Sequence, residues 1–169
     1  MKDRTMVTFT SGQTRFTYRV GAVIIRGDHV LLMRNLAEDY WFVPGGRVEI
    51  GECAATALAR EISEELGVAA RVERLIWINE NFFRIGSTSH HELALYFSVA
   101  MPPDALPDLS ATFYCDEADG SRYEVVWHRR DALKEVRLVP GFLTDTLTNI
   151  PGSVQHVVHV DDSARGWVS

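Results

Sequence analysis

The chain has 169 residues, of which 46% are hydrophobic and 24% charged, proportions typical of one folded globular domain spanning residues 1–169. The net charge is −6 and the longest basic run is Arg129-Arg130, so we expect no polymeric nucleic acid partner, which would require a basic surface. No apolar run approaches the ~20 residues that cross a bilayer, so no membrane partner is expected either.

The two cysteines, Cys53 and Cys115, lie far apart in the sequence and form no metal-type pair. A disulfide framework is therefore not expected. The first residues carry alternating charge and are not followed by the apolar segment of a signal peptide. Together these features favour a cytoplasmic location.

The N-terminal third predicts mainly strands. Residues 1–14 are polar and predict either a flexible arm or an edge strand. Residues 16–26 and 29–34 are rich in aromatic and β-branched side chains and predict a hairpin across a Gly-Asp turn signal. Residues 41–43 predict a short strand, and the Pro-Gly-Gly of residues 44–46 predicts a turn or loop.

One strong helix is predicted at residues 52–66, where Ala, Leu and Glu dominate, and Gly67 stands where a left-handed C-terminal cap is expected. Residues 70–83 and 91–101 predict two long strands, joined by the polar segment 84–89.

The C-terminal part predicts a long loop at residues 102–121, which hold three prolines and several acids. A strand at 122–128, short helices after residues 129 and 140, and a last strand near 153–160 complete the pattern. Strands outnumber helices, so the predicted fold class is α+β.

Three carboxylates lie on one side of the predicted helix. Glu61, Glu64 and Glu65 fall within one sector of about 100°, because positions i, i+3 and i+4 are neighbours, while Leu58 and Ile62 form an adjoining apolar stripe. Like charges at these spacings repel, whereas Mg²⁺ binds carboxylate oxygens together with water and phosphate oxygens. The pattern predicts a Mg²⁺ site, with a solvated acidic face as the alternative.

The residues around this face favour the metal site. Gly45 and Gly46 have little bulk, so the backbone can approach a ligand closely. Glu52 stands at the start of the helix, where a carboxylate suits the helix dipole. Arg60 can pair with a carboxylate or hold a phosphate.

Residues 46–68 resemble the Nudix box, Gly-x5-Glu-x7-Arg-Glu-U-x-Glu-Glu-x-Gly-U, in which U is a bulky aliphatic residue. Every specified position matches, namely Gly46, Glu52, Arg60, Glu61, Ile62, Glu64, Glu65, Gly67 and Val68. The preceding residues 41–45 are also similar to the approach to the box in MutT-like members.

The resemblance implies an α/β/α sandwich with a mixed β-sheet and the hydrolysis of a nucleoside diphosphate linked to another moiety. It implies Mg²⁺, or alternatively Mn²⁺, held by Glu61, Glu64 and Glu65, with the Gly46 backbone as a further ligand. Arg60 and Glu52 would orient these carboxylates, and Gly45 would support the site.

The general base is left open. Glu61 is the first candidate, and an acid of the 102–121 loop, Glu117 or Asp119, is the second. These two acids, together with Glu92, are also candidates for a further metal ligand. Glu117 and Asp119 have the equally weighted alternative of being solvated loop acids.

Several residues are candidates for binding the substrate. Arg84 could contact a terminal phosphate, and Phe82, Phe83 or Trp77 could stack on a base, with a place in the core as the alternative. His90 and Glu92 share one face of their strand, where they form either part of the site or a polar edge patch. Glu117 is a further substrate-binding candidate.

Three functions remain open at this point. The first is a hydrolase acting on a nucleoside triphosphate, nucleotide sugar, ADP-ribose or dinucleotide. The second is a catalytically silent, nucleotide-binding regulatory module. The third, an isomerase or RNA-processing enzyme on the same fold, is disfavoured by the short, acidic chain. The number of metal ions is open, and a homodimer is left as an alternative to a monomer.

Overall fold

The computed structural model describes residues 4–116 and 120–168. The elements follow in the order β1 (Thr8–Ser11), β2 (Thr14–Arg26), β3 (His29–Asn35), β4 (Gly45–Arg47), α1 (Ala54–Leu66), β5 (Arg71–Ile85), β6 (Thr88–Ala100), β7 (Thr112–Asp116), β8 (Arg122–Arg129), η1 (Arg130–Glu135), α2 (Leu143–Thr146), β9 (Gln155–Val160) and η2 (Asp162–Ala164).

The strands form one mixed sheet with the order β7-β8-β3-β2-β6-β5-β9. The β2–β6 and β5–β9 pairs are parallel, and the remaining neighbours are antiparallel. Strand β2 also pairs with β1 and β4 along the edge that it shares with β3. This long strand therefore connects the N-terminal hairpin, the short strand β4 and the centre of the sheet.

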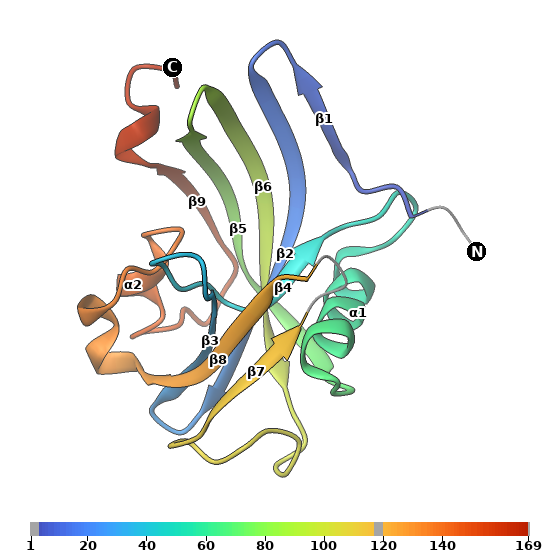
Figure 1. The fold of residues 1–169 in the computed structure, drawn as a ribbon, viewed down its shortest axis with the longest axis vertical. Coiled ribbons are helices and arrows are strands. Elements are labelled where there is room, and N and C mark those ends of the chain that lie inside the picture. The colour runs from blue at the N-terminus through green and yellow to red at the C-terminus, as the bar shows by residue number, and fades with distance from the viewer. Residues whose placement is uncertain (1–3, 117–119, 169) are drawn as a thin grey trace.

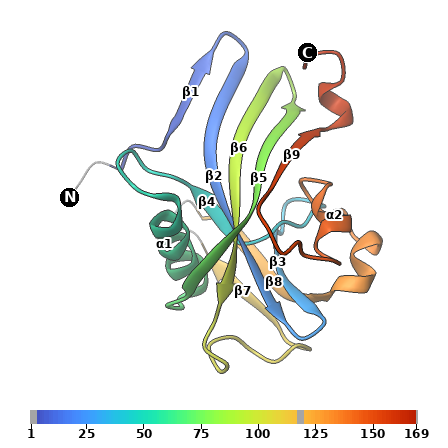
Figure 2. The same ribbon diagram turned by 180° about the vertical axis from the view of Figure 1, so that it is seen from behind.

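Helices lie on both sides of the sheet, with α1 on one side and α2 on the other (Figures 1 and 2). The alternation of side chains in the strands produces two cores. Leu31 and Met33 of β3 pack in the core that includes Ile62 of α1, whereas Leu32 packs in the core that includes Leu143 of α2. The predicted α+β class and the helix–sheet–helix layering are confirmed.

Two predictions about chain segments were wrong. Residues 44–46 were expected to form a turn, but Gly45–Arg47 is strand β4, paired with residues 19–21 of β2. The short strand expected at 41–43 consists only of isolated bridges, Trp41 with Leu138 and Phe42 with Met33. Proline and glycine are typical of turns, but here β2 supplies backbone partners that hold the glycines extended.

The loop expected at 102–121 was also only partly correct, because Thr112–Asp116 forms the edge strand β7 on β8. The expected strands at 70–83 and 91–101 are confirmed and longer than expected, since they meet in a tight hairpin between Ile85 and Thr88. The last strand is confirmed as β9.

The N-terminal segment takes the edge-strand alternative. Strand β1 pairs with β2, and before it Val7 donates a hydrogen bond to Val48 O at 2.8 Å, while Thr5 O accepts one from Ile50 at 2.8 Å. This segment therefore runs beside the residues that lead into α1. Within the described ranges, no helix is long and apolar enough to cross a bilayer.

Candidate functional site

Helix α1 places the three predicted carboxylates on one side because its other side is buried. Ala57, Leu58 and Ile62 are fully buried in the core. Gly67 ends the helix with φ of 67°, the left-handed conformation expected of its C-cap. The acidic side is therefore fixed relative to strand β4, which lies next to it.

Arg60 is the centre of a charged cluster. Its guanidinium donates to both oxygens of Glu52 at 3.1 and 3.0 Å, to Glu61 Oε1 at 2.8 Å and to Glu64 Oε2 at 3.3 Å. It also donates to the carbonyl oxygen of Arg47 at 3.1 Å. The hydrogen bonds from Arg60 hold the pKa of Glu52 below its ordinary value. Arg60 thus ties the acidic residues of the helix to the strand before it.

Strand β4 brings two glycines against the helix carboxylates. The Gly45 N–H donates to Glu65 Oε2 at 3.1 Å. A β-carbon on Gly46 would lie 2.2 Å from the carboxyl carbon of Glu61, and one on Gly45 would lie 2.2 Å from Val20 O. Only glycine fits at either position without displacing its neighbours.

Two residues of this cluster were missed in the sequence. Arg4 donates to Glu64 Oε1 at 2.6 Å, and its Nε lies 3.3 Å from Glu49 Oε1. The bond to Arg4 is the main reason that the pKa of Glu64 lies below its ordinary value. Neither residue occupies a specified position of the motif, and the pairing of residues 5–7 with 48–50 brings Arg4 to the helix.

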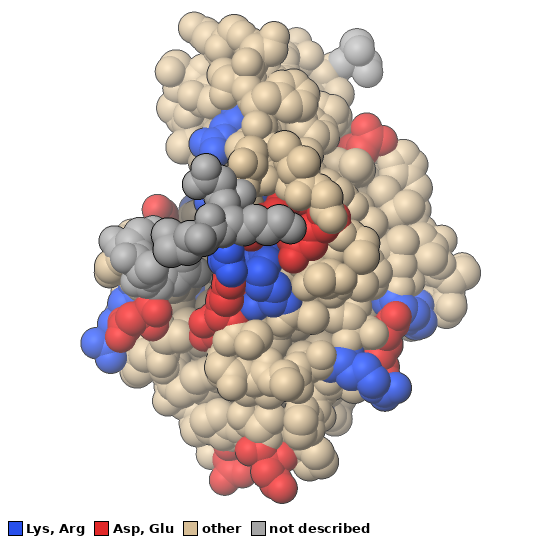
Figure 3. Space-filling model, turned by 90° about the vertical axis from the view of Figure 1, so that its right-hand side faces the viewer, with Lys and Arg blue, Asp and Glu red and all other residues tan. Residues whose placement is uncertain are grey.

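The carboxylate oxygens of this cluster are the type of ligand that Mg²⁺ takes. Arg60 is shared by the carboxylates of Glu49, Glu52, Glu61 and Glu64. With Arg4 as the second cation, this group of four carboxylates keeps an excess of negative charge beside the partly buried Gly46. In the structure these carboxylates form ion pairs with the two guanidinium groups. In the described ranges, no group of three His, Cys, Asp or Glu side chains stands in metal-binding geometry. Figure 3 views the molecule from the α1 side, where acidic and basic side chains lie next to one another near the centre of the face.

A cleft of about 730 Å³ begins at this cluster and continues across the sheet. It is bordered by Gly45, Gly46, Glu61, Glu64 and Glu65 at one end. Its floor is made by alternate residues of β2, β6 and β5, including Arg15, Thr17, Arg19, His90, Glu92 and Phe83. The volume lies within the range of small-molecule sites.

The structure separates the substrate-binding candidates. His90 and Glu92 line the cleft, and Arg84 borders it, although its guanidinium donates to Ser89 Oγ at 3.2 Å on the opposite face of the sheet. Phe82 does not line the cleft, because neighbouring residues of a strand face opposite ways. It stacks on His91 on the other face, with ring centroids 4.4 Å apart, and Phe83 lies in the cleft instead.

The stacking candidate Trp77 does not line the cleft. Trp77 is fully buried in the core that includes α2. Glu117 and Asp119 lie outside the described residues.

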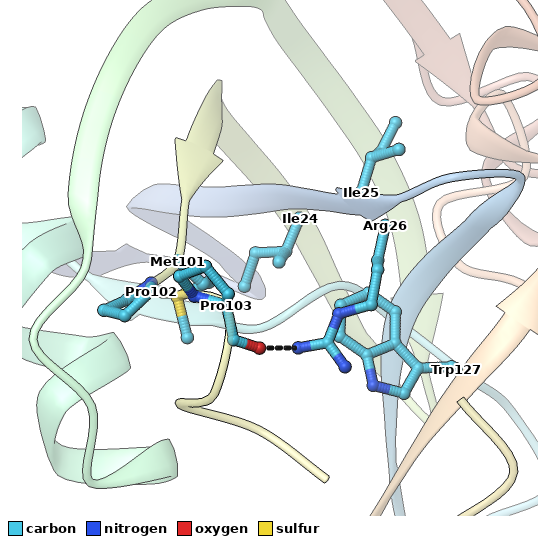
Figure 4. A pocket seen from close by; sticks show the side chains of 7 residues that line it. All are labelled: Ile24, Ile25, Arg26, Met101, Pro102, Pro103 and Trp127. Carbon is cyan, nitrogen blue, oxygen red and sulfur yellow. Dashed lines mark hydrogen bonds between the residues drawn. The ribbon is translucent and has the colours of Figure 1, made fainter. Parts of the chain in front are cut away.

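A second, smaller cavity of about 320 Å³ shares no lining residue with the cleft (Figure 4). The Arg26 guanidinium lies over the ring of Trp127, 4.6 Å from its centroid, and donates to Pro103 O at 3.2 Å and Pro107 O at 2.9 Å. Arg26 therefore fastens the segment that follows β6 to strand β2, which is a structural role.

Comparison with known proteins gives a consistent result. The profile of the NUDIX domain matches residues 15–143. The chain is 39% identical over 85 residues to diphosphoinositol polyphosphate phosphohydrolase 2 of Rattus norvegicus, a stretch that covers 48% of each protein. The matched part spans about half the length of the curated relatives.

Solved structures share the fold. The mutator MutT protein from Bacillus halodurans superposes with a TM-score of 0.58 at 16% identity, over 87% of this chain and 92% of that one. A UDP-X diphosphatase superposes with a TM-score of 0.53 at 19% identity, over 87% and 69% of the two chains. At these identities the likeness concerns the fold alone.

Proposed function

Because the chain belongs to the Nudix family, as the match over residues 15–143 establishes, we propose that it hydrolyses a diphosphate linkage in a small, nucleotide-type substrate in the presence of Mg²⁺. The observation that carries this proposal is the position of the helix carboxylates, which stand against the glycine backbone of β4 at one end of a cleft of about 730 Å³. The family membership agrees with the resemblance found in residues 46–68.

Glu61, Glu64 and Glu65 would hold the cation, with the Gly46 backbone beside them. When bound, Mg²⁺ would supply charge neutralisation on the phosphoryl oxygens and would lower the pKa of the attacking water. Mn²⁺ would fit the same oxygen ligands.

The protein's own groups would orient the reactants. Arg60 and Glu52 keep the carboxylates in place through the hydrogen bonds described above. Arg19 and Arg47 pair across β2 and β4, so both side chains stand on the cleft face beside the helix, where guanidinium groups would bind phosphoryl oxygens. We assign the general base to Glu61, which would accept the proton of the attacking water.

The proposed substrate class rests on two observations. The cleft has the volume of a small-molecule site, and the names of similar proteins mention a diphosphate. The names diphosphoinositol polyphosphate phosphohydrolase and UDP-X diphosphatase both mention a diphosphate, whereas the group attached to it differs between them. We therefore propose the linkage as the common feature and expect the attached group to be selected by the floor of the cleft.

The test is the release of phosphate-containing products from a panel of nucleoside triphosphates, nucleotide sugars, ADP-ribose and dinucleotides, with and without millimolar Mg²⁺. We expect Mg²⁺-dependent cleavage of at least one class, and its loss in Glu64→Gln. Binding of these compounds without any cleavage would contradict the proposal and favour a regulatory binding module.

A further inference from the structure

A chain of hydrogen bonds crosses the floor of the cleft at the end that β9 forms. His159 of β9 pairs with Asn81 of β5, and Asn81 pairs with Glu92 of β6, so the three side chains stand on the same side of the sheet. His159 Nδ1 lies 2.8 Å from Asn81 Oδ1, and Asn81 Nδ2 donates to Glu92 Oε2 at 3.2 Å. All three residues line the cleft, so a substrate would meet this network.

The direction of these hydrogen bonds fixes the proton of His159. A carboxylate oxygen only accepts, so the amide nitrogen of Asn81 donates to Glu92 and its Oδ1 is left to accept. His159 Nδ1 therefore carries the proton that is donated to Asn81. Burial lowers the pKa of His159, which favours the neutral ring. In a neutral imidazole with a protonated Nδ1, Nε2 is a hydrogen-bond acceptor.

Nε2 of His159 is open to a ligand. No hydrogen-bond donor of the described residues contacts this nitrogen, and the atom is not buried. It lies close to Gly141, since a β-carbon there would be 3.3 Å from Nε2. Gly141 borders the cleft together with Val139 and Pro140. The lack of a side chain at position 141 therefore leaves room beside the acceptor.

Asp161 adds a second acceptor at this end. It stands two positions after His159 and lines the cleft. Its Oδ1 accepts a hydrogen bond from the Ser163 N–H at 2.8 Å, which holds the pKa of Asp161 below its ordinary value. Among the described residues, no cationic nitrogen lies within 4.0 Å of this carboxylate. The β9 end of the cleft therefore suits a group that carries N–H donors.

The acceptors lie beside apolar surface. Phe83 stands two positions after Asn81 on the same side of β5, and it lines the cleft together with Val139 and Pro140. A sugar placed here would leave some of its hydroxyl groups without partners, which costs free energy. A planar base with an exocyclic amino group fits better, because its ring contacts the apolar surface while its N–H group donates to the acceptor. Adenine and cytosine carry such an amino group, whereas hypoxanthine and uracil carry a carbonyl oxygen in its place.

The separation between β9 and the helix carboxylates suits a nucleotide. Strand β4, which holds Gly46, pairs with β2, and β6, β5 and β9 follow in the sheet. Four spacings between neighbouring strands amount to about 19 Å. This length is comparable to that of an extended nucleoside triphosphate, so phosphates near α1 allow the base to reach β9.

We propose that His159 is a specificity-determining residue, whose Nε2 accepts a hydrogen bond from the exocyclic amino group of an adenine or cytosine base. The placement of the cleaved linkage at α1 rests on the proposed function. Asn81 and Glu92 are positioning residues, because they hold the ring of His159 and the proton on its Nδ1. The preferred substrates are therefore adenine or cytosine nucleotides that contain a diphosphate.

The test compares nucleoside monophosphates that differ in this group, AMP with IMP and CMP with UMP. These compounds contain no diphosphate linkage, so calorimetry can measure their affinity in the presence of Mg²⁺ without turnover. We expect the amino member of at least one pair to bind about tenfold more tightly, because a carbonyl oxygen would face the lone pair of Nε2 and leave it unpaired.

His159→Phe should remove this preference, since it keeps a ring in place but offers no acceptor. Gly141→Ala is an independent test that leaves the network intact. It should reduce the preference, because the new β-carbon would stand 3.3 Å from Nε2 and crowd the amino group. His156→Phe is the matched control, as His156 also belongs to β9 but contacts Glu80 and lies outside the cleft. Thermal melting verifies that each variant is folded.

Four results contradict the proposal. They are equal affinity within both pairs, tighter binding of the carbonyl members, no binding of any of the four compounds, and a preference that persists in folded His159→Phe or is unaltered in Gly141→Ala.

Hydrolysis of ATP, ITP, CTP and UTP with Mg²⁺ separates this proposal from the proposed function. Cleavage with equal kcat/KM within both pairs, and without a preference in affinity, retains the hydrolase and overturns the role of His159. A preference in affinity that His159→Phe loses, without cleavage of any diphosphate compound, retains the base recognition and overturns the hydrolase.

Discussion

The carboxylate of Glu61 lies against the backbone of Gly46, in the space that a side chain at position 46 would occupy. A β-carbon there would be 2.2 Å from the carboxyl carbon of Glu61 and 2.4 Å from its Oε2. Gly46 does not have a positive φ, so the need for glycine comes from this contact and not from the backbone conformation. The glycine at the first position of the motif is thus explained by its contact with Glu61, the fourth specified position.

Gly46→Ala should therefore displace Glu61 while leaving the strand intact. We expect Mg²⁺ affinity and turnover to fall about tenfold or more, the range for changes that misplace a metal ligand. Calorimetry with Mg²⁺ and the hydrolysis assay measure both quantities. Gly152→Ala is the matched control, because a β-carbon there would meet no atom within 4 Å. Wild-type Mg²⁺ affinity in Gly46→Ala would refute the role of this contact.

Glu64→Gln and Glu65→Gln should each lower kcat by about two to three orders of magnitude. Each change removes a charged oxygen ligand but retains the volume of the side chain, and it reduces repulsion on the acidic side of α1. Thermal melting should show only a small change, because the exposed ion pairs that Glu64 makes with Arg4 and Arg60 contribute little to stability. Glu135→Gln, at an exposed position of η1, is the control for lost charge. Undiminished turnover in either site variant would remove that residue from the metal site.

Arg4→Ala tests whether the N-terminal segment adjusts the metal site. Arg4 occupies Glu64 Oε1 at 2.6 Å and competes there with a cation. Its removal should tighten Mg²⁺ binding about two- to fivefold, the modest effect expected of an exposed ion pair. Calorimetry with Arg71→Ala as the control measures this change. Weaker binding in Arg4→Ala would show instead that Arg4 positions Glu64 for the metal.

His128 should make the stability of the fold depend on pH. Burial lowers the pKa of His128 below its ordinary value of 6.5, and its ring packs on Trp41 with centroids 4.4 Å apart. The unfolded chain takes up a proton on His128 more readily than the folded protein does. The neutral, buried His128 therefore contributes fully to the free energy of unfolding above pH 6.5. This contribution is lost as the pH falls through the lower pKa that His128 has in the folded protein. His128→Phe should therefore lose less stability between pH 7 and pH 5 than the wild type, as measured by urea unfolding at both values. An identical loss in the two proteins would exclude this role.

The helix and its acidic side could be predicted because they depend on local spacing. Glu61, Glu64 and Glu65 share a side in any helix, and Gly67 ends this one where its lack of a side chain permits a left-handed backbone. The long strands were also recognisable from their β-branched and aromatic residues. These features require no knowledge of distant contacts.

The remaining features depend on pairing between distant segments. Gly45–Arg47 is a strand because β2 supplies its partners, which no local pattern encodes. Arg4 reaches Glu64 only because the first residues lie beside residues 48–50. Strand alternation could have separated Phe83 from Phe82, but which of them faces the cleft depends on the register with β6.

The most direct test of the account is the Mg²⁺ dependence of hydrolysis in one experiment with two proteins, the wild type and Glu64→Gln. The wild type should cleave at least one diphosphate compound of the panel only when Mg²⁺ or Mn²⁺ is present, and Glu64→Gln should be slower by about two orders of magnitude or more. Cleavage that persists in EDTA, or equal rates in the two proteins, would contradict it.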